Sequence, residues 1–484
     1  MGLSFVKNKS KISTVISVFI IMKLLYIGSG FVGACSATVM ADSGHMVLVY
    51  DINKDKIKKL GSKDYDQIQS SLFEEGLADL LINNQERIKF TADYSEVEKF
   101  LDDCEAVFMC LPTPEIGETG ESNLTYYFDA AEKLGQSLKN RNNGKQEKYI
   151  IIVNKSTVPI DMVDKTKELL EENHVKNFGV VSNPEFLVEG KAIQGSLKPD
   201  RVVVGAWNQK DFDIMRKIYQ RFYSSPTTIY IEVNPKEAAA GKLLANYYLL
   251  HKLIACYDVM GRVSETFADL QFENLRKILS TDKRIGDWGL FDSLYAGGSC
   301  LVKDIRSLSH QLQTAGVSAS LVNEVYAGNK RQLELFMSRA SAEANFDFTK
   351  KKIALLGTAF KRNTNDIRNS ASIDLTNYLL KNNIQEIHVY DPVAMDNFKI
   401  LFPENEQIKY FHNEFDAVKD ADVIIITTDW PQFRGLADTI MGELKHKPLI
   451  MDGRRILQHR YADLQSAGFD IIAVGSPFLK SKSL

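Results

Sequence analysis

Cysteine is scarce in this chain of 484 residues, and its distribution argues against two common uses of the residue. The five cysteines are an odd number, and no two of them form a CxxC pair. A disulfide framework and a structural zinc site are therefore not expected, and a reducing, cytoplasmic setting fits best. The five positions are Cys35, Cys104, Cys110, Cys256 and Cys300.

A hydrophobic run long enough to cross a membrane is also lacking. Residues 15–22 are apolar except for Ser17, and three lysines precede them, which is a pattern similar to a secretory leader. No small-residue cleavage site follows, and Lys23 interrupts the run before the roughly 20 apolar residues that a spanning helix needs. We therefore expect residues 1–21 to be an amino-terminal extension, and we expect no membrane partner.

Charge of one sign is not in excess, since the formal net charge is −3. Because the chain has no excess of positive charge, nucleic acid is not an expected partner. The eight histidines do not cluster at metal-ligand spacing, so no metal site is expected. At roughly 150 residues per domain, the length predicts about three domains.

Short apolar runs alternate with helical patterns from residue 22 onward. This alternation predicts a parallel sheet that is covered by helices on both faces. We assign residues 22–232 to one doubly wound domain. Its predicted strands are residues 23–27, 46–50, 106–111, 149–153, 179–182 and 201–204.

The pattern becomes helical after Pro235. Residues 236–280 contain no proline, and apolar residues recur at helical spacing from Leu243 onward. A second helical stretch covers residues 317–344. Together they predict a central helical domain at residues 233–345 that contains a long helix.

The strand pattern returns in the last third of the chain, which predicts a second α/β domain at residues 346–484. The predicted fold class is thus α/β, with two Rossmann-like doubly wound domains joined by a central helical domain. The apolar runs of the second α/β domain are residues 352–357, 386–390, 422–427 and 448–451.

The first predicted strand leads into Gly28-x-Gly30-x-x-Gly33 and then into a predicted helix. Glycines at this spacing allow a tight turn and the close approach of a pyrophosphate to the helix amino terminus. Asp51 ends the second predicted strand, where a carboxylate can accept hydrogen bonds from the adenosine ribose. Because this acid would repel a 2′-phosphate, NAD is favoured over NADP. A glycine turn without a ligand is the alternative interpretation.

Cys300 follows a pair of glycines, which place a side chain on an open turn. Lys303 lies nearby in sequence, and a cationic neighbour lowers the pKa of a thiol. We therefore consider Cys300 a candidate nucleophile, and a buried structural cysteine is the alternative.

Lys242 and Asn246 are four residues apart and fall on one face of a predicted helix. Both side chains could donate to a developing oxyanion. For these two residues the alternative is an ordinary solvated helix face.

Nine motifs occur together in one order along most of the chain. In this respect the sequence resembles the nucleotide-sugar dehydrogenases of the UDP-glucose/GDP-mannose dehydrogenase family. The motifs are GSGFVG, LPTP, KSTVP, SNPEFLVEG, KLLAN, RIG, GGSCLVKD, AFKRNTNDIR and DGRR, and they run from residue 28 to residue 455.

The resemblance implies an NAD-dependent, four-electron oxidation of a nucleotide sugar to the acid, with UDP-glucose as the first candidate substrate. Cys300 would add to an aldehyde as a thiohemiacetal, and a second oxidation would give a thioester that water hydrolyses. The catalytic set implied is Cys300 as nucleophile, Thr157 and Asp304 as holders of the water, Glu185 as general acid/base, and Lys242 and Asn246 as donors to the oxygen on sugar C6.

The resemblance also implies binding residues and a partner subunit. In this family the RIG arginine reaches into the neighbouring subunit, so Arg284 implies at least a homodimer, formed through the central domain. The implied NAD contacts are Gly28, Gly30, Phe31, Val32, Gly33, Asp51, Lys56, Thr113, Thr157, Glu189, Lys303 and Arg368. The implied nucleotide-sugar contacts are Glu185, Phe186, Leu187, Glu189, Lys242, Asn246, Arg284, Gly297, Phe360, Lys361 and Arg455, or Arg454 in place of Arg455.

Three departures from the family pattern stand out. Ala296 lies where an aromatic residue usually precedes GGSC, which bears on the shape of the sugar pocket. Val302 replaces a proline that occurs in relatives. Residues 73–77, FEEGL, replace a common YEPGL, and we interpret this as a minor loop change.

Other functions remain open at the level of sequence. A sister activity on GDP-mannose would use the same catalytic residues. A two-electron hydroxyacid dehydrogenase of similar domain plan would not need the cysteine. A non-catalytic NAD-binding scaffold would need none of the reactive residues.

Overall fold

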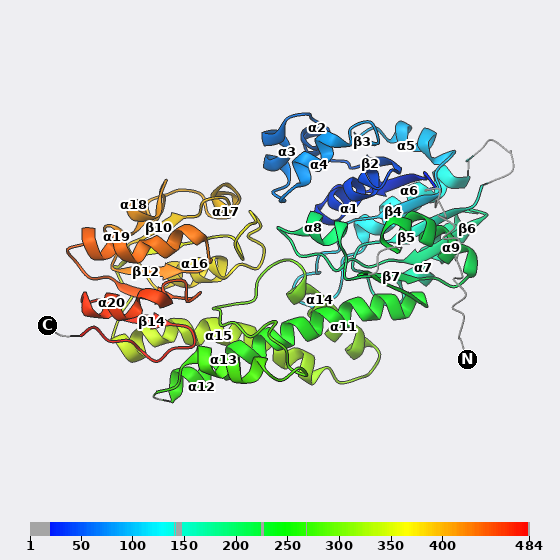
Figure 1. Cartoon of the computed structure of the whole chain (residues 1–484). Helices are drawn as coiled ribbons and strands as arrows, with labels where there is room; N and C mark the ends of the chain where they lie inside the picture. The colour runs from blue at the N-terminus through cyan, green and yellow to red at the C-terminus, as the bar shows by residue number, and fades with distance from the viewer. Residues whose placement is uncertain (1–19, 140, 142–147, 224–226, 268, 483–484) are drawn as a thin grey trace, which may run out of the picture.

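The computed structural model describes residues 20–139, 141, 148–223, 227–267 and 269–482. Most of the expected amino-terminal extension, residues 1–19, lies outside the described residues. The chain forms two α/β lobes joined by long helices (Figure 1). Among the described residues, every helix is too short or too polar to span a bilayer.

The first lobe is built on an eight-stranded sheet with the order β3-β2-β1-β4-β5-β6-β7-β8. All neighbouring strands are parallel except β6 and β7, which meet in one antiparallel pair. The strands are β1 (Lys23–Ile27), β2 (Met46–Tyr50), β3 (Ile88–Thr91), β4 (Ala106–Met109), β5 (Ile150–Asn154), β6 (Phe178–Ser182), β7 (Arg201–Gly205) and β8 (Ile229–Val233).

Helices cover both faces of this sheet, because the central strands carry apolar side chains on both sides. One core lies under α1 and α8, and the other lies under α5, α6 and α7. The helices are α1 (Phe31–Asp42), α2 (Lys54–Leu60), α3 (Tyr65–Ser71), α4 (Leu77–Asn83), α5 (Tyr94–Leu101), α6 (Thr125–Lys139), α7 (Met162–Glu172), α8 (Ala192–Leu197), α9 (Gln209–Ile218) and α10 (Gln220–Tyr223).

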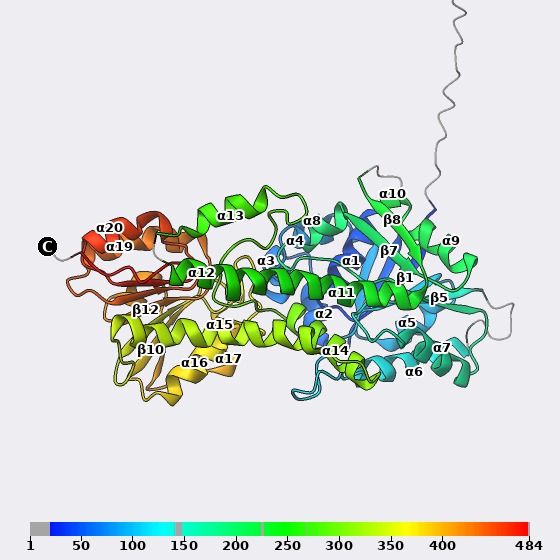
Figure 2. The same cartoon turned by 90° about the horizontal axis from the view of Figure 1, so that it is seen from below.

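The central part is helical, as predicted, and begins with a strong start signal. Asn234 caps α11, Pro235 is its first residue, and Glu237 completes a capping box. In Figure 2, α11 and α15 run alongside each other from one lobe to the other. The helices are α11 (Pro235–Ile254), the π-helix η2 (Ala255–Met260), α12 (Gly261–Thr266), α13 (Phe272–Ser280), α14 (Leu301–Thr314) and α15 (Ser320–Ala344).

The second lobe has a six-stranded, fully parallel sheet with the order β11-β10-β9-β12-β13-β14. The strands are β9 (Lys352–Leu356), β10 (Glu386–Tyr390), β11 (Ile408–Tyr410), β12 (Val423–Ile426), β13 (Leu449–Asp452) and β14 (Ile471–Ala473). The helices are α16 (Ala371–Lys381), α17 (Met395–Leu401), α18 (Glu414–Val418), η3 (Pro431–Gly435), α19 (Leu436–Glu443), η4 (Gln458–Arg460) and α20 (Tyr461–Ser466).

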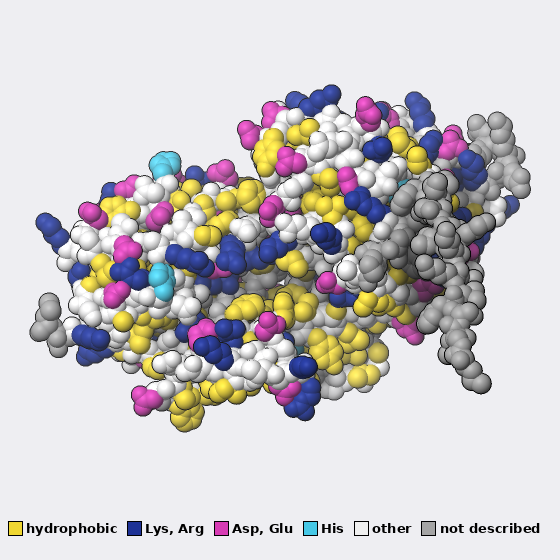
Figure 3. Space-filling view, viewed as in Figure 1, with side chains coloured by type: hydrophobic (Ala, Val, Ile, Leu, Met, Phe, Trp, Pro, Cys, Tyr) yellow, Lys and Arg dark blue, Asp and Glu magenta, His cyan; other side chains and the backbone are white. Residues whose placement is uncertain are grey.

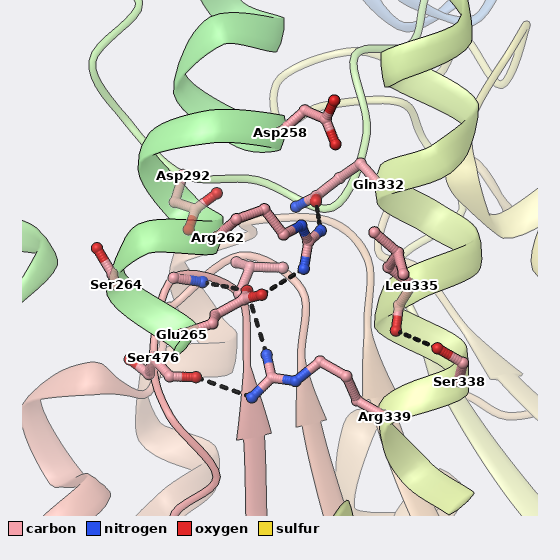
Figure 4. A network of polar contacts seen from close by, with 12 residues as sticks. Asp258, Arg262, Ser264, Glu265, Asp292, Gln332, Leu335, Ser338, Arg339 and Ser476 are labelled. Carbon is pink, nitrogen blue, oxygen red and sulfur yellow. Dashed lines mark hydrogen bonds and ion pairs between the residues drawn. The ribbon is translucent and has the colours of Figure 1, made fainter. Parts of the chain in front are cut away.

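A buried polar network joins the central helices to this lobe (Figure 4). Arg339 of α15 donates to the main-chain oxygens of Ala473 at 2.9 Å and Ser476 at 2.8 Å. Glu265 of α12 pairs with Arg339 at 3.2 Å and accepts the main-chain N–H of Gly475 at 2.8 Å. Three segments distant in sequence are thus tied together where the second sheet ends.

The predicted fold class is confirmed: two doubly wound α/β lobes flank a helical centre. The residue limits of the domains stay predictions. Four strands, β3, β8, β11 and β14, were not predicted, and neither was helix α14 as a separate element. β11 and β14 have three residues each, and β3, β8 and β11 are only partly buried, so these strands lack the long, continuous apolar runs that marked the others.

Candidate active site

The glycine turn after β1 has the shape that a pyrophosphate needs. Gly28 has φ +100°, and a Cβ there would lie 2.2 Å from the main-chain oxygen of Cys110. A Cβ at Gly33 would lie 2.0 Å from the main-chain oxygen of Gly28, whereas one at Gly30 would face open space. The turn therefore packs tightly on the protein side and is open on the other, which fits a dinucleotide at the start of α1.

Asp51 lies at the end of β2, beside this turn. Its Oδ2 accepts the main-chain N–H of Ser29 at 2.8 Å and the Ser29 hydroxyl at 2.7 Å, and its Oδ1 accepts the N–H of Asn53 at 3.0 Å. A carboxylate has lone pairs left over after these three bonds, so it can still accept from ribose hydroxyls. Burial lowers the pKa of Lys56, the charge of Asp51 opposes this shift, and Arg368 adds to it. Lys56 and Arg368, two predicted NAD contacts, are thus close enough to influence each other.

The other predicted NAD contacts lie along the same side of the lobe. Phe31 and Val32 open α1. The hydroxyl of Thr113 donates to the main-chain oxygen of Thr157 at 2.8 Å, and Lys303 Nζ lies 3.5 Å from that hydroxyl. The loops after β4 and β5 are therefore joined to α14.

Lys242 and Glu185 form a buried ion pair, with Nζ 3.3 Å from Oε1. Burial alone would lower the pKa of Lys242, but the charges of Glu185, Asp304 and Cys300 raise it above the ordinary value. Glu185 Oε2 also accepts the main-chain N–H of Leu187 at 2.5 Å. Lys242 is therefore held as an ammonium ion beside the carboxylate.

Asn246 and Asp304 form a second buried pair next to the first. Asn246 Nδ2 donates to Asp304 Oδ2 at 2.6 Å, and Lys303 Nζ donates to Asp304 Oδ1 at 2.6 Å. Since Lys242 and Asn246 come from adjacent turns of α11, the helix presents two nitrogen donors to one place, as the i, i+4 spacing predicted.

Cys300 lies at the amino-terminal end of α14, and the residue is exposed, whereas its sulfur lies close enough to these groups for their charges to act on it. Protein packed around the sulfur raises the pKa of the thiol to about 11, and the charges of Glu185 and Asp304 contribute in the same direction. Lys242 opposes this effect. The expectation that Lys303 lowers the pKa of the thiol is wrong, because Lys303 is paired with Asp304 and two carboxylates lie near the sulfur. The alternative interpretation of Cys300, a structural cysteine buried in an apolar core, is not what the structure shows.

The turn that carries Cys300 is fastened to the second lobe. Gly298 has φ +92° and a Cβ there would lie 2.9 Å from the ring of Phe360. Its N–H donates to the main-chain oxygen of Arg368 at 3.0 Å, and its oxygen accepts Asn369 Nδ2 at 3.1 Å. At Gly297, a Cβ would lie 2.4 Å from the oxygen of Asn369. Cys300 therefore lies where both lobes and the central helices meet.

Glu189 lies at the same junction, between the two lobes. Thr364 donates to Glu189 Oε1 at 2.8 Å, and Lys361 Nζ donates to the Glu189 main-chain oxygen. Burial raises the pKa of Glu189 to about 7, and the charge of Asp366 adds to this shift. Lys and Arg side chains gather along the surface where the two lobes face each other, which suits an anionic ligand (Figure 3).

Phe186 lies between two cations rather than in open space. The guanidinium of Arg201 lies 3.8 Å from its ring centroid, and Lys242 Nζ lies 5.4 Å from it. Leu187 follows in the same loop, and its main-chain N–H is bonded to Glu185. Three of the predicted nucleotide-sugar contacts thus form one loop beside α11.

Two predicted contacts lie apart from this cluster. The side chain of Arg284 is 90% exposed, and its ion-pair partner is Asp282. Arg455, with φ +51°, donates to the oxygen of Val474 at 2.8 Å, whereas Arg454 donates to the oxygen of Phe360. Of the two arginines, Arg454 therefore lies on the side of the site, and a substrate contact by Arg455 stays a prediction.

Glu74 was not among the predicted site residues, yet it holds the loop that carries Glu189. Its buried carboxylate accepts the main-chain N–H of Gly190 at 2.5 Å and that of Ala192 at 3.1 Å. Glu74 is common to FEEGL and to the YEPGL of the family pattern, so this anchor does not bear on the interpretation of the segment as a minor loop change, which stays a prediction.

Most of this chain is similar to known proteins of one family, in sequence and in fold. Three models of the UDP-glucose/GDP-mannose dehydrogenase family match in order: the NAD binding domain at residues 22–223, the central domain at 236–331 and the UDP binding domain at 354–459. A UDP-glucose 6-dehydrogenase of Rickettsia bellii is 32% identical, covering 94% of this chain and 100% of the relative. UDP-glucose 6-dehydrogenase TuaD of Bacillus subtilis is 30% identical, covering 95% and 94%. The solved structure of a UDP-glucose dehydrogenase from Pyrobaculum islandicum superposes with a TM-score of 0.82 at 25% identity, covering 92% of this chain and 97% of that one.

Proposed function

Since the chain belongs to the UDP-glucose/GDP-mannose dehydrogenase family, it is an NAD-dependent oxidoreductase, and we propose that it oxidises UDP-glucose to UDP-glucuronate. The substrate is inferred from the relatives named above and from the match of the second lobe to a UDP binding domain. One observation carries the proposal: an exposed thiol, a buried ammonium ion and two buried carboxylates converge where the two lobes meet.

The first oxidation converts the C6 alcohol to an aldehyde. When bound, NAD accepts one hydride in each of the two oxidations. The alcohol also loses a proton, and Glu185 is placed to take part in its transfer. Lys242 and Asn246 are the donors that would stabilise negative charge on the C6 oxygen, which is worth several kcal/mol in a site of this kind.

Cys300 then forms a covalent bond from Sγ to C6, and the thiol proton passes to the aldehyde oxygen. Loss of a second hydride from C6, together with the proton of the thiohemiacetal hydroxyl, gives a thioester. Water held by Asp304 and Thr157 attacks C6, the C–S bond breaks, and the products are a carboxylate and the free thiol. Two hydrides leave per sugar, so the four electrons are accounted for.

The test is a panel of nucleotide sugars with NADH counted per sugar oxidised. We expect two NADH per UDP-glucose and UDP-glucuronate as the product. The Cys300→Ser variant should lose complete oxidation by about 10³-fold or more, because no covalent intermediate can form. GDP-mannose as the sole substrate would overturn the substrate assignment, and one NADH with a stable aldehyde or ketone would overturn the four-electron chemistry.

We also propose that two subunits assemble through the central helices. Apolar side chains on the outer side of α11 and the helices after it are exposed, including Tyr248 at 69% and Val259 at 60%. Leu244 and Val263 extend the same stripe, since the four positions repeat at helical spacing. Exposed apolar side chains that recur along one side of a helix are typical of an interface. The exposed Arg284, which lies apart from the cluster around Cys300, fits a role in the other subunit.

Assembly is tested by light scattering on the purified protein, with Tyr248→Glu as the interface variant. We expect wild type to be a dimer or larger and the variant to shift toward monomer.

All five cysteines are free thiols, which supports a cytoplasmic setting.

A further inference from the structure

The loop from Thr113 to Ser122, here called the strap, lies across helix α14, whose preceding residue is Cys300. Lys303 Nζ reaches the Thr113 hydroxyl at 3.5 Å, and the hydroxyls of Ser122 and Ser307 are 3.3 Å apart. The strap therefore contacts α14 over more than one turn.

Arg306 makes the strongest of these contacts. Its Nε donates to Glu115 Oε1 at 2.8 Å, its Nη2 lies 2.7 Å from the same oxygen, and its guanidinium also donates to the main-chain oxygen of Glu118. The two side chains are largely buried, at 14% exposed for Arg306 and 20% for Glu115. Partial burial makes such a charge-assisted contact stronger than a surface ion pair.

Glu115 also sets the shape of the strap itself. Its carboxylate accepts the main-chain N–H of Gly120, and its main chain pairs with Ser122 in an antiparallel bridge. Gly120 has φ +81°, and a Cβ there would lie 2.5 Å from the main-chain oxygen of Arg306. The strap is thus closed on itself and pressed against the helix by the same carboxylate.

All these contacts fall on one face of α14. Positions 303, 306, 307 and 310 follow one another at the i+3 and i+4 spacing of a helix. Val302, Ile305 and Leu308 lie on the opposite face and pack in the central core. The helix is therefore clamped between the core and the strap, and Arg306 lies six residues after Cys300, about 9 Å along the helix.

We propose that Arg306 and Glu115 are positioning residues that couple the NAD-binding loop to the nucleophile. The inference rests on the proposed function, because Thr113 at the start of the strap is a predicted NAD contact and Cys300 is the proposed nucleophile. If NAD binding orders the strap, the contacts between Glu115 and Arg306 would also fix the position of α14. A displacement of α14 would, in turn, loosen the strap.

The test measures both ends of this coupling without turnover. NAD affinity is followed by quenching of protein fluorescence. Cys300 is followed by its rate of alkylation with iodoacetamide, which is selective because the other four cysteines are buried. The variants are Glu115→Gln, Arg306→Met and the double variant. Glu121→Gln is the matched control, since Glu121 contributes its main-chain oxygen to the strap.

We expect Glu115→Gln and Arg306→Met to weaken NAD binding by about tenfold, whereas Glu121→Gln changes it by less than about twofold. The same two variants should change the alkylation rate of Cys300 at least about threefold, because the start of α14 is no longer held. The double variant should resemble Arg306→Met alone, since both substitutions remove one pair.

In steady state, the KM for NAD should rise while the KM for the nucleotide sugar stays within about twofold, a split that general destabilisation would not give. If NAD affinity and Cys300 alkylation in Glu115→Gln both match those in Glu121→Gln, or if only one end changes, the coupling does not exist. If wild type is inactive on every nucleotide sugar, the proposed function fails, but the two binding and labelling measurements still decide the coupling.

Discussion

At the scale of single residues, the environment of Cys300 favours the thiol over the thiolate. Burial comes first among the causes, followed by the nearby charges of Glu185 and Asp304, and together they raise the pKa to about 11. A thiol that stays protonated is protected from oxidation and alkylation. In the proposed mechanism, its proton is then available for the aldehyde oxygen.

This environment predicts the pH dependence of Cys300 alkylation in the ligand-free enzyme. Because the pKa is raised, the rate should climb by about tenfold per pH unit between pH 7 and pH 9 without reaching a plateau. Glu185→Gln removes a negative charge, which lowers the pKa and speeds alkylation at pH 8. Lys242→Met removes the opposing cation and slows it. Labelling followed by mass spectrometry gives the rates, with Cys300→Ser as the blank, and a plateau below pH 8 would contradict the prediction.

The sequence identified the reactive residues better than the residues that hold them. Cys300, Lys242, Asn246, Glu185 and Asp304 were all predicted, and the structure brings them together. The contacts of Glu74 with Gly190 and of Glu115 with Arg306 span 116 and 191 residues, respectively. Pairs so far apart have no local pattern in one sequence, so only the fold reveals them.

At the scale of elements, local pattern predicted the long and strongly apolar segments. β1 was predicted at its observed limits, because its residues are apolar and almost all buried. β11 has only three residues, and β8, although as long as β1, has no buried residue, so the first lacks the length and the second the burial that such a pattern needs. Helix α14 was not predicted as a separate element, although its buried apolar residues Val302, Ile305 and Leu308 recur at helical spacing.

The junction of the central helices with the second lobe contains a buried acid that titrates at an unusual pH. Asp292 lies beside α12 in the network of Figure 4, and its Oδ2 has no hydrogen-bond partner among the described residues. Burial raises the pKa of Asp292 to about 8, and the charge of Glu265 adds to the shift. The folded protein therefore binds this proton more tightly than the unfolded chain does, where the pKa is about 3.9.

Linkage fixes the sign of the effect on stability. The contribution of Asp292 to the free energy of unfolding is fully present below about pH 4. It is lost as the pH rises toward 8, by about 1.4 kcal/mol per pH unit at most. Asp292→Asn has a similar shape and cannot ionise, so its advantage in Tm over wild type should grow from pH 5 to pH 8. Differential scanning fluorimetry at several pH values measures this gap. A gap that is independent of pH would mean that Asp292 does not change its charge in this range.

At the scale of the whole molecule, the site is divided among three parts that would have little chemistry alone. The first lobe supplies the glycine turn, Asp51 and Glu185, the central helices supply Lys242, Asn246 and Cys300, and the second lobe holds the cysteine turn through Phe360 and Asn369. Lys and Arg side chains line the surface between the two lobes, where an anionic ligand would meet all three parts. Of the two predicted contacts that lie apart from the cluster around Cys300, Arg284 is the one whose side chain is exposed, at 90%.

The proposed dimer explains that position and predicts complementation between two inactive variants. Arg284→Ala removes the arginine offered to the other subunit, and Cys300→Ser removes the nucleophile. In a mixed dimer, the subunit with intact Cys300 receives Arg284 from its neighbour, so one of its two sites is complete. Random assembly after co-expression should therefore restore about a quarter of wild-type activity.

The measurement uses two affinity tags, so that mixed dimers are purified by both and compared with each variant alone. Each homodimer should be inactive or nearly so, and the doubly purified sample should show about half of wild-type activity per dimer. The control dimer pairs a subunit that carries both substitutions with a wild-type subunit. It also keeps one intact Cys300, but the neighbouring subunit has no Arg284 to contribute to that site. This control dimer should be inactive. It is a stringent control, because it contains the same two substitutions as the first mixed dimer and differs only in how they are divided between the subunits. If Arg284 instead served its own subunit, the first mixture would stay inactive and the second would be half active.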